Sequence, residues 1–347
     1  TKVAAGFRAR PYAILFGMSN RQFIAVGDTT MDTFIRLKEA EVHCDIDKEN
    51  CTICMRFGDK LPYEFVEDVP AVGNAANAAV AAARLGLSSA LVTDVGDDNI
   101  GKKDLASLKK DGVDETFVSI HKGMKSNHHY VLWYDAERTI LVKHEEYSYR
   151  FPDIGEPVWL YLSSLAHHSL PYHKEIETYL ATHPNIRLAF QPGTFQMTLG
   201  VEKLKGIYER ANVFVCNTDE ARRILKTEEE DVHALLANIR ALGPKIALIT
   251  DGPKGAYVSD GAETWFMPPY PDVQPPYDRT GAGDAFASTF VAMLALGKSI
   301  PEALSFAPIN AMSVVQNVGA QKGLLSREAL ETYLSKAPTD YKPKRLS

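Results

Sequence analysis

The 347-residue chain is 45% hydrophobic and carries a formal net charge of −6, so it can bury a large core but lacks the basic balance typical of nucleic-acid-binding domains. No stretch approaches the roughly 20 consecutive apolar residues of a membrane span, and no membrane partner is expected. Four cysteines in so long a chain do not suggest a disulfide framework, and a reducing, cytoplasmic setting fits them best.

Short β-rich runs alternate with amphipathic or alanine-rich helices over most of the chain. A first strand at 23–28 is followed by a helix of small residues at 74–86, a strand from 88 and a helix at 102–112. Four further buried-strand candidates are VWLYLSSL, IRLAFQPG, NVFVCN and IALITDG. This alternation predicts an α/β fold with a mainly parallel sheet and helices on both faces. Ligands in such sheets bind at the carboxyl ends of the strands.

Two segments break the alternation. Residues 33–70 contain no long helix, and residues 126–147 resemble a hairpin with a turn at 135–138. Because both leave from strand ends on the expected ligand side, a small β-structured lid that excludes water is one interpretation. The other interpretation is an insertion without a catalytic role or a surface for dimerisation. One segment can serve both as a lid and as a dimerisation surface.

The two ends of the chain differ from the part between them. Residues 1–21 are expected to be an extension lying on the fold, and residues 334–347 a polar tail with a loose end. The domain itself is predicted to span residues 22–333.

The run DRTGAGDAFASTF, residues 278–290, places two glycines and an aspartate before an apolar helix. We expect a loop at 281–283 and a helix that starts near Asp284 and stops at Gly297. A helix start presents unpaired N–H groups and partial positive charge, and glycines allow an anion to approach them closely. Asp284 could instead merely cap the helix, which leaves the glycines unexplained.

Cysteine and histidine clusters raise the question of a metal site. Cys44, Cys51 and Cys54 lie close in sequence beside His43, and such a set could bind zinc. The spacing is irregular and no second CxxC pair exists, so ordinary strand cysteines are the favoured interpretation. The histidine pairs at 128–129 and 167–168 have no carboxylate at a suitable spacing and are interpreted as structural or pocket-lining.

Common phosphate-binding motifs do not explain the glycine run. The sequence GxxxxGK[ST] occurs nowhere, and protein-kinase motifs are absent. GxGxxG is not completed at residue 281, because Phe286 stands at the position of its third glycine.

The motifs that do match resemble the ribokinase-like, or PfkB, carbohydrate kinase family. Residues 278–290 resemble its second signature, D-T-x-G-A-G-D-x-F, and residues 72–86 resemble its first, a glycine pair followed by Asn and an alanine-rich helix. Four more segments follow in the family's order, at 93–114, 217–220, 250–256 and 306–320. The resemblance covers about residues 23–333. It implies a ribokinase-like three-layer αβα sandwich with a mainly parallel central sheet and a small β-rich lid.

The resemblance also assigns roles around the reacting group. The backbone of Gly281, Ala282 and Gly283 would stabilise the charge on the transferred γ-phosphoryl group. Asp284 would accept the proton of the substrate hydroxyl and so act as the base. The substrate itself would be bound by Asp32, Gly73, Asn77 and Asp284.

The nucleotide side is implied by three further matches. Asn217 and Glu220 match the magnesium motif. Thr250, Gly252 and Gly255 match the ATP loop, and Ala307 and Asn310 match the segment that contacts adenine. Magnesium would be held mostly through water. Asp278 and Thr280 match the segment that lines a monovalent-cation site in many relatives, so potassium activation is a further expectation.

The chain departs from the family pattern at several positions. Val72 replaces the first glycine of the usual pair, and Gln191 stands where relatives usually have aspartate. Arg279 stands where a small residue is commoner and is interpreted as a surface ion pair rather than a phosphate contact. Asn74 and Ala75 stand where sugar-phosphate kinases often carry lysine, which favours an unphosphorylated substrate.

The sequence therefore predicts an ATP-dependent kinase that phosphorylates a hydroxymethyl group of a sugar or sugar-like molecule. A nucleoside kinase is the first alternative, since an aromatic wall over Asp32, built from Tyr130, Trp133 and Tyr134, would favour a base. A non-catalytic ligand-binding or regulatory protein is disfavoured because the base and the anion loop are both present. A homodimer through the lid is compatible with each of these interpretations.

Overall fold

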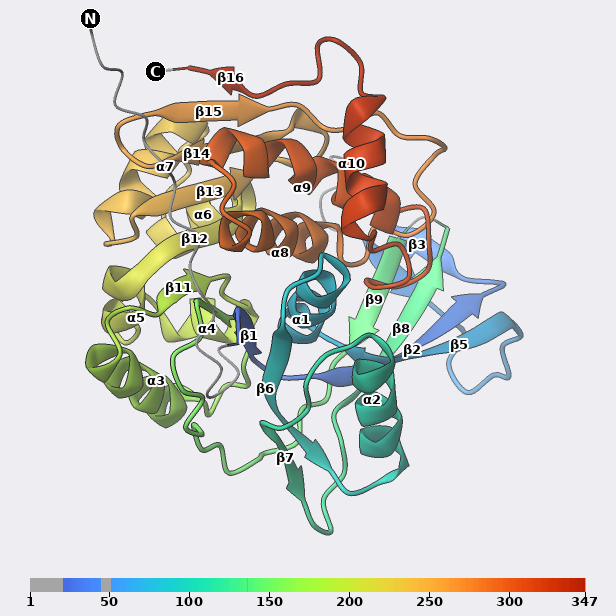
Figure 1. The fold of residues 1–347 in the computed structure, drawn as a ribbon. Coiled ribbons are helices and arrows are strands. Elements are labelled where there is room, and N and C mark those ends of the chain that lie inside the picture. The colour runs from blue at the N-terminus through green and yellow to red at the C-terminus, as the bar shows by residue number, and fades with distance from the viewer. Residues whose placement is uncertain (1–20, 45–50, 136, 347) are drawn as a thin grey trace, which may run out of the picture.

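The computed structural model describes residues 21–44, 51–135 and 137–346, and its centre is a ten-stranded sheet (Figure 1). The strand order is β16-β15-β14-β13-β12-β11-β10-β1-β6-β7. From β13 to β7 every neighbouring pair is parallel, and β14, β15 and β16 add an antiparallel edge. The strands are β1 (Phe23–Val26), β6 (Ser89–Gly96), β7 (Val118–His121), β10 (Trp159–Leu162), β11 (Arg187–Phe190), β12 (Ala211–Asn217), β13 (Ile246–Thr250), β14 (Ala256–Ser259), β15 (Thr264–Met267) and β16 (Lys344–Arg345).

Helices cover both faces of this sheet, as the predicted three-layer sandwich requires. In β1, Phe23 and Ala25 enter one core while Ile24 and Val26 enter the other, because successive strand residues point to opposite faces. The first core is completed by α1 (Asn74–Arg84), α2 (Asn99–Lys110), α8 (Ala282–Ala295), α9 (Ile300–Val314) and α10 (Arg327–Ser335). The second is completed by α3 (Leu170–Thr182), α4 (Thr194–Leu199), α5 (Lys205–Arg210), α6 (Thr218–Leu225) and α7 (Val232–Ala241).

A second sheet, with the order β5-β2-β8-β9, forms the lid beside the central sheet (Figure 1). Its strands are β2 (Thr30–Leu37), β5 (Tyr63–Val72), β8 (His128–Tyr134) and β9 (Glu137–Leu141). Phe34, Val131 and Trp133 on its inner face pack against Val318, which follows α9. The two segments that break the predicted alternation therefore meet in one sheet, and the small β-rich lid is confirmed.

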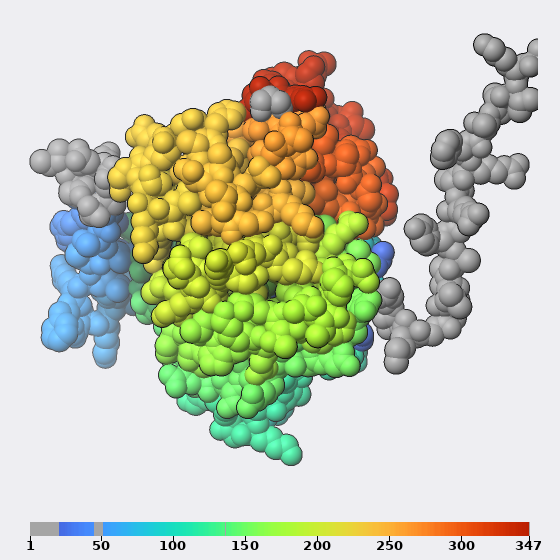
Figure 2. All heavy atoms as spheres, turned by 90° about the vertical axis from the view of Figure 1, so that its left-hand side faces the viewer, coloured from blue at the N-terminus to red at the C-terminus, as the bar shows by residue number. Residues whose placement is uncertain are grey.

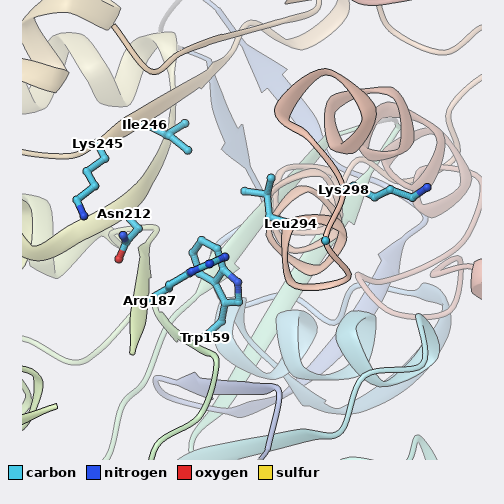
Figure 3. A pocket seen from close by; sticks show the side chains of 8 residues that line it. Trp159, Arg187, Asn212, Lys245, Ile246, Leu294 and Lys298 are labelled. Carbon is cyan, nitrogen blue, oxygen red and sulfur yellow. The ribbon is translucent and has the colours of Figure 1, made fainter. Parts of the chain in front are cut away.

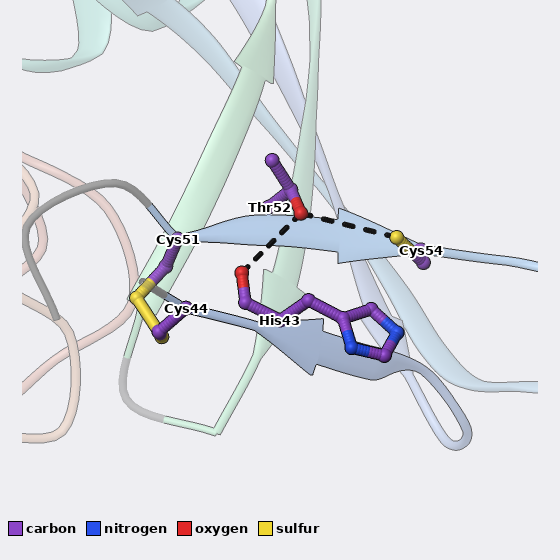
Figure 4. The surroundings of a disulfide bond; sticks show 5 residues. All are labelled: His43, Cys44, Cys51, Thr52 and Cys54. Carbon is purple, nitrogen blue, oxygen red and sulfur yellow. Dashed lines mark hydrogen bonds between the residues drawn. A yellow bond between two sulfur atoms is a disulfide. The ribbon is translucent and has the colours of Figure 1, made fainter. Parts of the chain in front are cut away.

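The cysteine cluster lies on a separate hairpin of β3 (Glu41–His43) and β4 (Thr52–Cys54). Cys44 and Cys51 form a disulfide there, and Cys54 is an exposed free thiol (Figure 4). In Figure 2 the blue part of the chain, which includes these strands, projects from the left side of the molecule. The expectation of unpaired strand cysteines is thus wrong for Cys44 and Cys51. Within the described residues no group of three histidine, cysteine or acidic side chains could hold a metal ion.

The remaining expectations concern the bounds of α8, the two ends of the chain and membrane spans. Helix α8 begins at Ala282 rather than near Asp284, so the glycine run belongs partly to the helix, which ends at Ala295. The tail is not wholly loose, since β16 pairs with the edge strand β15. Residues 1–20 of the expected N-terminal extension lie outside the described residues. No helix in the described chain is long and apolar enough to cross a membrane.

Candidate active site

A pocket at the carboxyl ends of the central strands gathers the residues predicted for phosphoryl transfer. It is lined by Asn74, Arg138, Gln191, Val215, Cys216, Asn217, Glu220, Thr250, Arg279, Gly281, Ala282, Gly283 and Asp284. The predicted base, the anion loop, both residues of the magnesium motif and one residue of the ATP loop thus share one cavity. This is the strand end at which open α/β sheets bind ligands.

The Asp284 carboxylate is held by three side-chain amides. Its Oδ1 accepts hydrogen bonds from Asn74 Nδ2 at 2.8 Å and Gln191 Nε2 at 3.0 Å, and its Oδ2 accepts one from Asn77 Nδ2 at 2.8 Å. A carboxylate offers about four acceptor positions, so one position on Oδ2 is left for a ligand. Burial raises the pKa of Asp284 above its ordinary value, and the amides oppose this by stabilising the ionised form.

The start of α8 owes its shape to Gly281. This residue has φ +78°, and a Cβ there would lie 2.2 Å from Ala320 Cβ, so only glycine fits. Gly283 differs, because it lies inside the helix and a Cβ on it would meet nothing within 4 Å. The N–H groups of the first helical turn have no intrahelical partner, so the turn can bind an anion.

Gln191 shows what the departure from the family's aspartate accomplishes. Its Oε1 accepts a hydrogen bond from the Tyr161 hydroxyl while its Nε2 donates to Asp284. The Gln191 side chain is therefore oriented by Tyr161 and holds the Asp284 carboxylate with its amide N–H. An aspartate here would place a second carboxylate beside Asp284, with no N–H to offer.

Asn217 and Glu220 are placed by the start of α6, where they form a reciprocal capping box. Asn217 Oδ1 accepts from the Glu220 N–H at 2.8 Å, and Glu220 Oε2 accepts from the Asn217 N–H at 2.9 Å. Burial raises the pKa of Glu220. The remaining carboxylate oxygen gives the pocket a hard oxygen donor of the kind magnesium prefers. One carboxylate and one amide fit an ion that keeps most of its waters.

The other predicted nucleotide residues lie in different surroundings. Thr250 lines the pocket, whereas Gly252 and Gly255 form the turn after β13 with φ +50° and +107°. Ala307 and Asn310 are fully buried in α9. The Asn310 amide donates to Thr289 Oγ1 at 2.7 Å and accepts from the Leu325 N–H at 2.9 Å, so it serves the core. A contact of these two residues with adenine stays a prediction that this geometry does not support.

Asp278 anchors the loop before α8. Its Oδ1 accepts from the N–H and the hydroxyl of Thr280 at 2.9 and 2.6 Å, and its Oδ2 accepts from the Gly319 N–H at 2.8 Å. Both oxygens are thus committed to holding the loop. The predicted potassium site at Asp278 and Thr280 stays a prediction.

The predicted substrate residues lie on α1, directly before it and on the lid. Asn77 contacts Asp284 directly, as described above. A Cβ on Gly73 would lie 2.7 Å from the carbonyl oxygen of Asp28, so the start of α1 runs close to the end of β1. Asp32 lies on lid strand β2 and is 8% exposed. Helix α1 therefore contacts Asp284 through Asn77 and begins beside the end of β1, which leads to Asp32.

Arg138 lines the pocket but was not predicted from the sequence, where it is only the last residue of the expected turn at 135–138. It lies on lid strand β9 and lines the pocket beside the start of α8. Its Nη1 is 4.0 Å from Asp278 Oδ1, and its buried Nε has no hydrogen-bond partner within the described residues. Arg279 lines the same pocket, and no ion pair of Arg279 is found in the described part of the chain, so its interpretation as a surface ion pair gains no support.

A second hollow lies at the opposite, amino ends of the central strands (Figure 3). Trp159 of β10, Arg187 of β11 and Ile246 of β13 contribute to its wall. None of the predicted site residues lies there. The predicted chemistry is therefore assigned to the first pocket.

Comparisons with known proteins identify the family of this chain. Residues 67–327 match the pfkB family carbohydrate kinase profile. The chain belongs to the pfkB family. Ribokinase of Bacillus subtilis (strain 168) is 31% identical over 269 residues, which cover 76% of this chain and 87% of that protein. Fructoselysine 6-kinase of Escherichia coli (strain K12) is 27% identical over 249 residues, covering 72% and 90%.

A solved structure shows that the pfkB fold extends over nearly the whole chain. Arabidopsis thaliana ribokinase complexed with ribose and ATP matches with a TM-score of 0.75 and 20% identity, covering 91% of this chain and 99% of that one. The predicted family and the ribokinase-like α/β sandwich with a lid are therefore confirmed.

Proposed function

We propose that this pfkB kinase transfers the γ-phosphoryl group of ATP to a hydroxymethyl group of a sugar or sugar-like substrate, with Asp284 as the base. The observation that carries the proposal is the Asp284 carboxylate. It lies in the first turn of α8, keeps one acceptor position after three amide bonds, and shares its pocket with Glu220.

The reaction can be written on this chain's groups. The substrate hydroxyl gives its proton to Asp284 Oδ2, and its oxygen forms a bond to the γ-phosphorus as the bond to the departing ADP oxygen breaks. The free N–H groups at the start of α8 face the charge that spreads over the transferred group. Arg138 and Arg279 add two positive charges to the same pocket. Phosphoryl transfer depends mainly on such positioning and charge stabilisation.

Two cations accompany the proposal. Magnesium, held through water by Glu220 and Asn217, would neutralise phosphate oxygens. Potassium would act near Asp278 and Thr280. A comparison of turnover in potassium and sodium buffers tests the second expectation, and equal rates would remove it.

A sugar fits the acceptor site better than a nucleoside. Trp133 faces Phe65 at 5.9 Å and Tyr277 at 5.0 Å between ring centroids, so its ring is already packed. Tyr130 lies on the outer face of the lid and is 43% exposed. The predicted aromatic wall over Asp32 is therefore not formed by these two rings. The printed names of the relatives, a ribokinase and a fructoselysine kinase, support the same choice.

The lid could also join two copies of the chain. On its outer face Val66 pairs with Ile35, and Tyr130 pairs with Leu141 across the strands. Val66, Tyr130 and Leu141 are exposed apolar side chains, as expected for a dimerisation surface. Sedimentation of the purified protein tests this, and a monomer would contradict it. A cytoplasmic location stays an expectation from the sequence.

Turnover of an acceptor panel tests the main proposal. Pentoses, hexoses, ketoses and nucleosides are scored by ADP release, with wild type and the Asp284→Asn variant. We expect a sugar to be the best acceptor and the variant to lose about a thousandfold or more in kcat while still binding ATP. Asp219→Asn is the matched control, because Asp219 is exposed on neighbouring α6. Full activity of Asp284→Asn would refute the base.

A further inference from the structure

The hollow at the amino ends of the central strands has a volume of about 340 Å³ (Figure 3). We name it the basal hollow, and its wall includes Trp159, Arg187, Asn212, Lys245, Ile246 and Leu294. Small-molecule sites in proteins have volumes of about 300–1,000 Å³, so the basal hollow is large enough for one. None of these six residues has a role in the proposed reaction.

The basal hollow and the active pocket lie at opposite ends of the same elements. Strands β11, β12 and β13 begin at the hollow and end at the active pocket. Helix α8 begins at the active pocket and brings Leu294, in its last turn, to the hollow. The helix has 14 residues and is therefore about 20 Å long. A small ligand in the basal hollow thus lies too far from Asp284 to be the phosphoryl donor or acceptor.

Trp159 has a hydrogen-bonding group without a partner. The residue is 2% exposed, and its buried Nε1 has no hydrogen-bond partner among the described residues. The indole N–H can only donate, and a buried indole usually finds an acceptor. Because Trp159 lines the basal hollow, an acceptor atom of a bound ligand can supply that partner.

Asn212 offers further N–H donors at the same hollow. Its Oδ1 accepts hydrogen bonds from the Leu188 N–H at 2.9 Å and from Arg210 Nη1 at 3.3 Å. Both bonds use the oxygen and so fix the orientation of the amide. No partner of Asn212 Nδ2 is found in the part of the chain that the structure describes, so its two N–H bonds are left for a ligand.

The unpaired charges of the basal hollow are positive. No ion pair of Arg187 or Lys245 is found within the described residues, and the hollow has no acidic side chain among those that line it. The Arg187 guanidinium lies 5.8 Å from the centroid of the Trp159 ring. Lys298 also lines the hollow, but its Nζ is 3.8 Å from Glu302 Oε1 and extends away from Trp159 in Figure 3. Two unpaired cations beside unpaired N–H donors favour an anion.

The rest of the wall is apolar. Ile246 and Leu294 pack against the core cluster that contains Trp159, and each keeps part of its side chain exposed. Apolar and aromatic walls with a few convergent polar groups are typical of small-molecule sites. A ligand that fills the basal hollow therefore needs an apolar part as well as a negative charge.

We infer that the basal hollow is a second binding site, which takes a small organic anion with a flat apolar part and a carboxylate or phosphate group. The anionic group lies against Arg187 and Lys245 and accepts from the N–H groups of Trp159 and Asn212, while the apolar part contacts Leu294. The inference does not depend on the proposed reaction, because none of these residues lines the active pocket.

Fluorescence of Trp159 locates the ligand directly. The chain has three tryptophans, so Trp133→Phe combined with Trp265→Phe leaves Trp159 as the reporter. Phenyl phosphate and benzoate are the anionic probes, and inorganic phosphate and benzyl alcohol are the controls for charge without a ring and for a ring without charge. We expect at least one anionic probe to change the emission and to bind about tenfold more tightly than either control. The tighter anionic probe distinguishes a phosphate ligand from a carboxylate ligand.

Calorimetry with the same probes tests the contacts in a chain that keeps all its tryptophans. Lys245→Gln and Arg187→Gln should each weaken binding of the tighter probe about tenfold, as for one lost charge-assisted hydrogen bond. Lys205→Gln is the matched control, since Lys205 is an exposed lysine on α5 outside the basal hollow. Thermal unfolding shows that each variant is folded.

Asp284→Asn should bind the probe as tightly as wild type, which separates this site from the active pocket. Loss of probe binding in Asp284→Asn would place the probe at the start of α8 and overturn the inference. Failure of both anionic probes to bind, or unchanged affinity in both Lys245→Gln and Arg187→Gln, would overturn it as well. Loss of turnover in Asp284→Asn bears only on the proposed base.

Discussion

The two ends of the proposed active site differ in the groups that they present, which are backbone N–H groups at one end and side chains at the other. At the phosphoryl end, the first turn of α8 presents backbone N–H groups, and Asp284 is held by amides from α1 and from the loop after β11. At the proposed sugar end, Asp28 follows β1, Asp32 and His129 lie on lid strands β2 and β8, and His144 follows β9. The first end rests on the central core, and the second depends on how the lid lies against it.

This difference separates general chemistry from specificity. Backbone groups at a helix start bind the charge of any phosphoryl group, and they need only the correct chain conformation. Hydrogen-bonding side chains bind one particular arrangement of hydroxyl groups. The relative positions of these side chains change when the lid sequence changes. We therefore expect the proposed phosphoryl end to suit many acceptors and the lid to determine which acceptor is used.

The strongest way to break the comparison is to change the backbone at the phosphoryl end. Gly281→Ala forces an L-residue into φ +78° and onto Ala320, so the start of α8 must shift. We expect kcat to fall about a thousandfold, as when an anion hole loses its donors. Steady-state ADP release measures this.

Gly283→Ala is the matched comparison, because its Cβ meets nothing within 4 Å and its φ is not positive. Thermal unfolding should show unchanged or greater stability, since alanine favours a helix by about 1 kcal/mol over glycine. If Gly281→Ala keeps full activity, the backbone account of this end is wrong.

Arg138→Gln tests the one charge that the lid brings to the phosphoryl end. Loss of the guanidinium should lower kcat about a hundredfold and change the KM of the sugar little, because the charge faces the transferring group rather than the sugar. Rapid-mixing kinetics and binding of ADP with a phosphoryl-mimicking fluoride complex measure the effect.

Added guanidinium ion should restore part of the activity of Arg138→Ala, which a purely structural role would not allow. Arg56→Gln is the control, since Arg56 is an exposed arginine near the β3–β4 hairpin. A rise in sugar KM with unchanged kcat would instead place Arg138 at the sugar end.

Gln191→Leu tests how the base is tuned. Burial raises the pKa of Asp284, and the Gln191 amide opposes this by stabilising the ionised form. Without the amide, the pKa of Asp284 should rise further. Because the base must be ionised, the acid limb of the kcat–pH profile should move upward by about one pH unit.

The profile is measured from pH 4 to 9, with Gln274→Leu as a control in an exposed loop. A downward shift would contradict the account of the amide.

Asp104→Asn tests the contact between α2 and lid strand β5, and we expect its effect, which is on stability, to be the smallest. Burial raises the pKa of Asp104 to about 7, the Asp98 and Asp32 carboxylates add to this, and the hydrogen bond from the Ala71 N–H at the end of β5 opposes it. With a pKa raised from 3.8, the folded state binds this proton more tightly than the unfolded state. The stabilisation is complete below pH 4 and is lost as the pH rises to about 7.

Urea unfolding at pH 5 and pH 8 measures this as the difference between wild type and Asp104→Asn. The free energy of unfolding should fall with pH more steeply in wild type, by at most about 1.4 kcal/mol per pH unit. Parallel pH dependences would show that Asp104 has no raised pKa.

Much of the fold and half of the site follow from local sequence. The alternation of strands and helices predicts the sandwich, because side-chain periodicity is a property of each segment by itself. Gly281 and Asp284 are recognisable for a similar reason, since a left-handed residue and an open helix start make demands on the chain that few sequences meet. The lid is visible only as a break in this pattern.

The tertiary structure alone decided which distant side chains meet. Arg138 reaches the pocket through the pairing of β9 with β8, and His129 meets His144 because the chain after β9 returns past the lid. Likewise, the pairing of Cys44 with Cys51 and the strand at Lys344–Arg345 left no pattern in the sequence. Backbone requirements are imposed within a few residues and leave a motif, whereas contacts between separate segments depend on the packing of the whole chain.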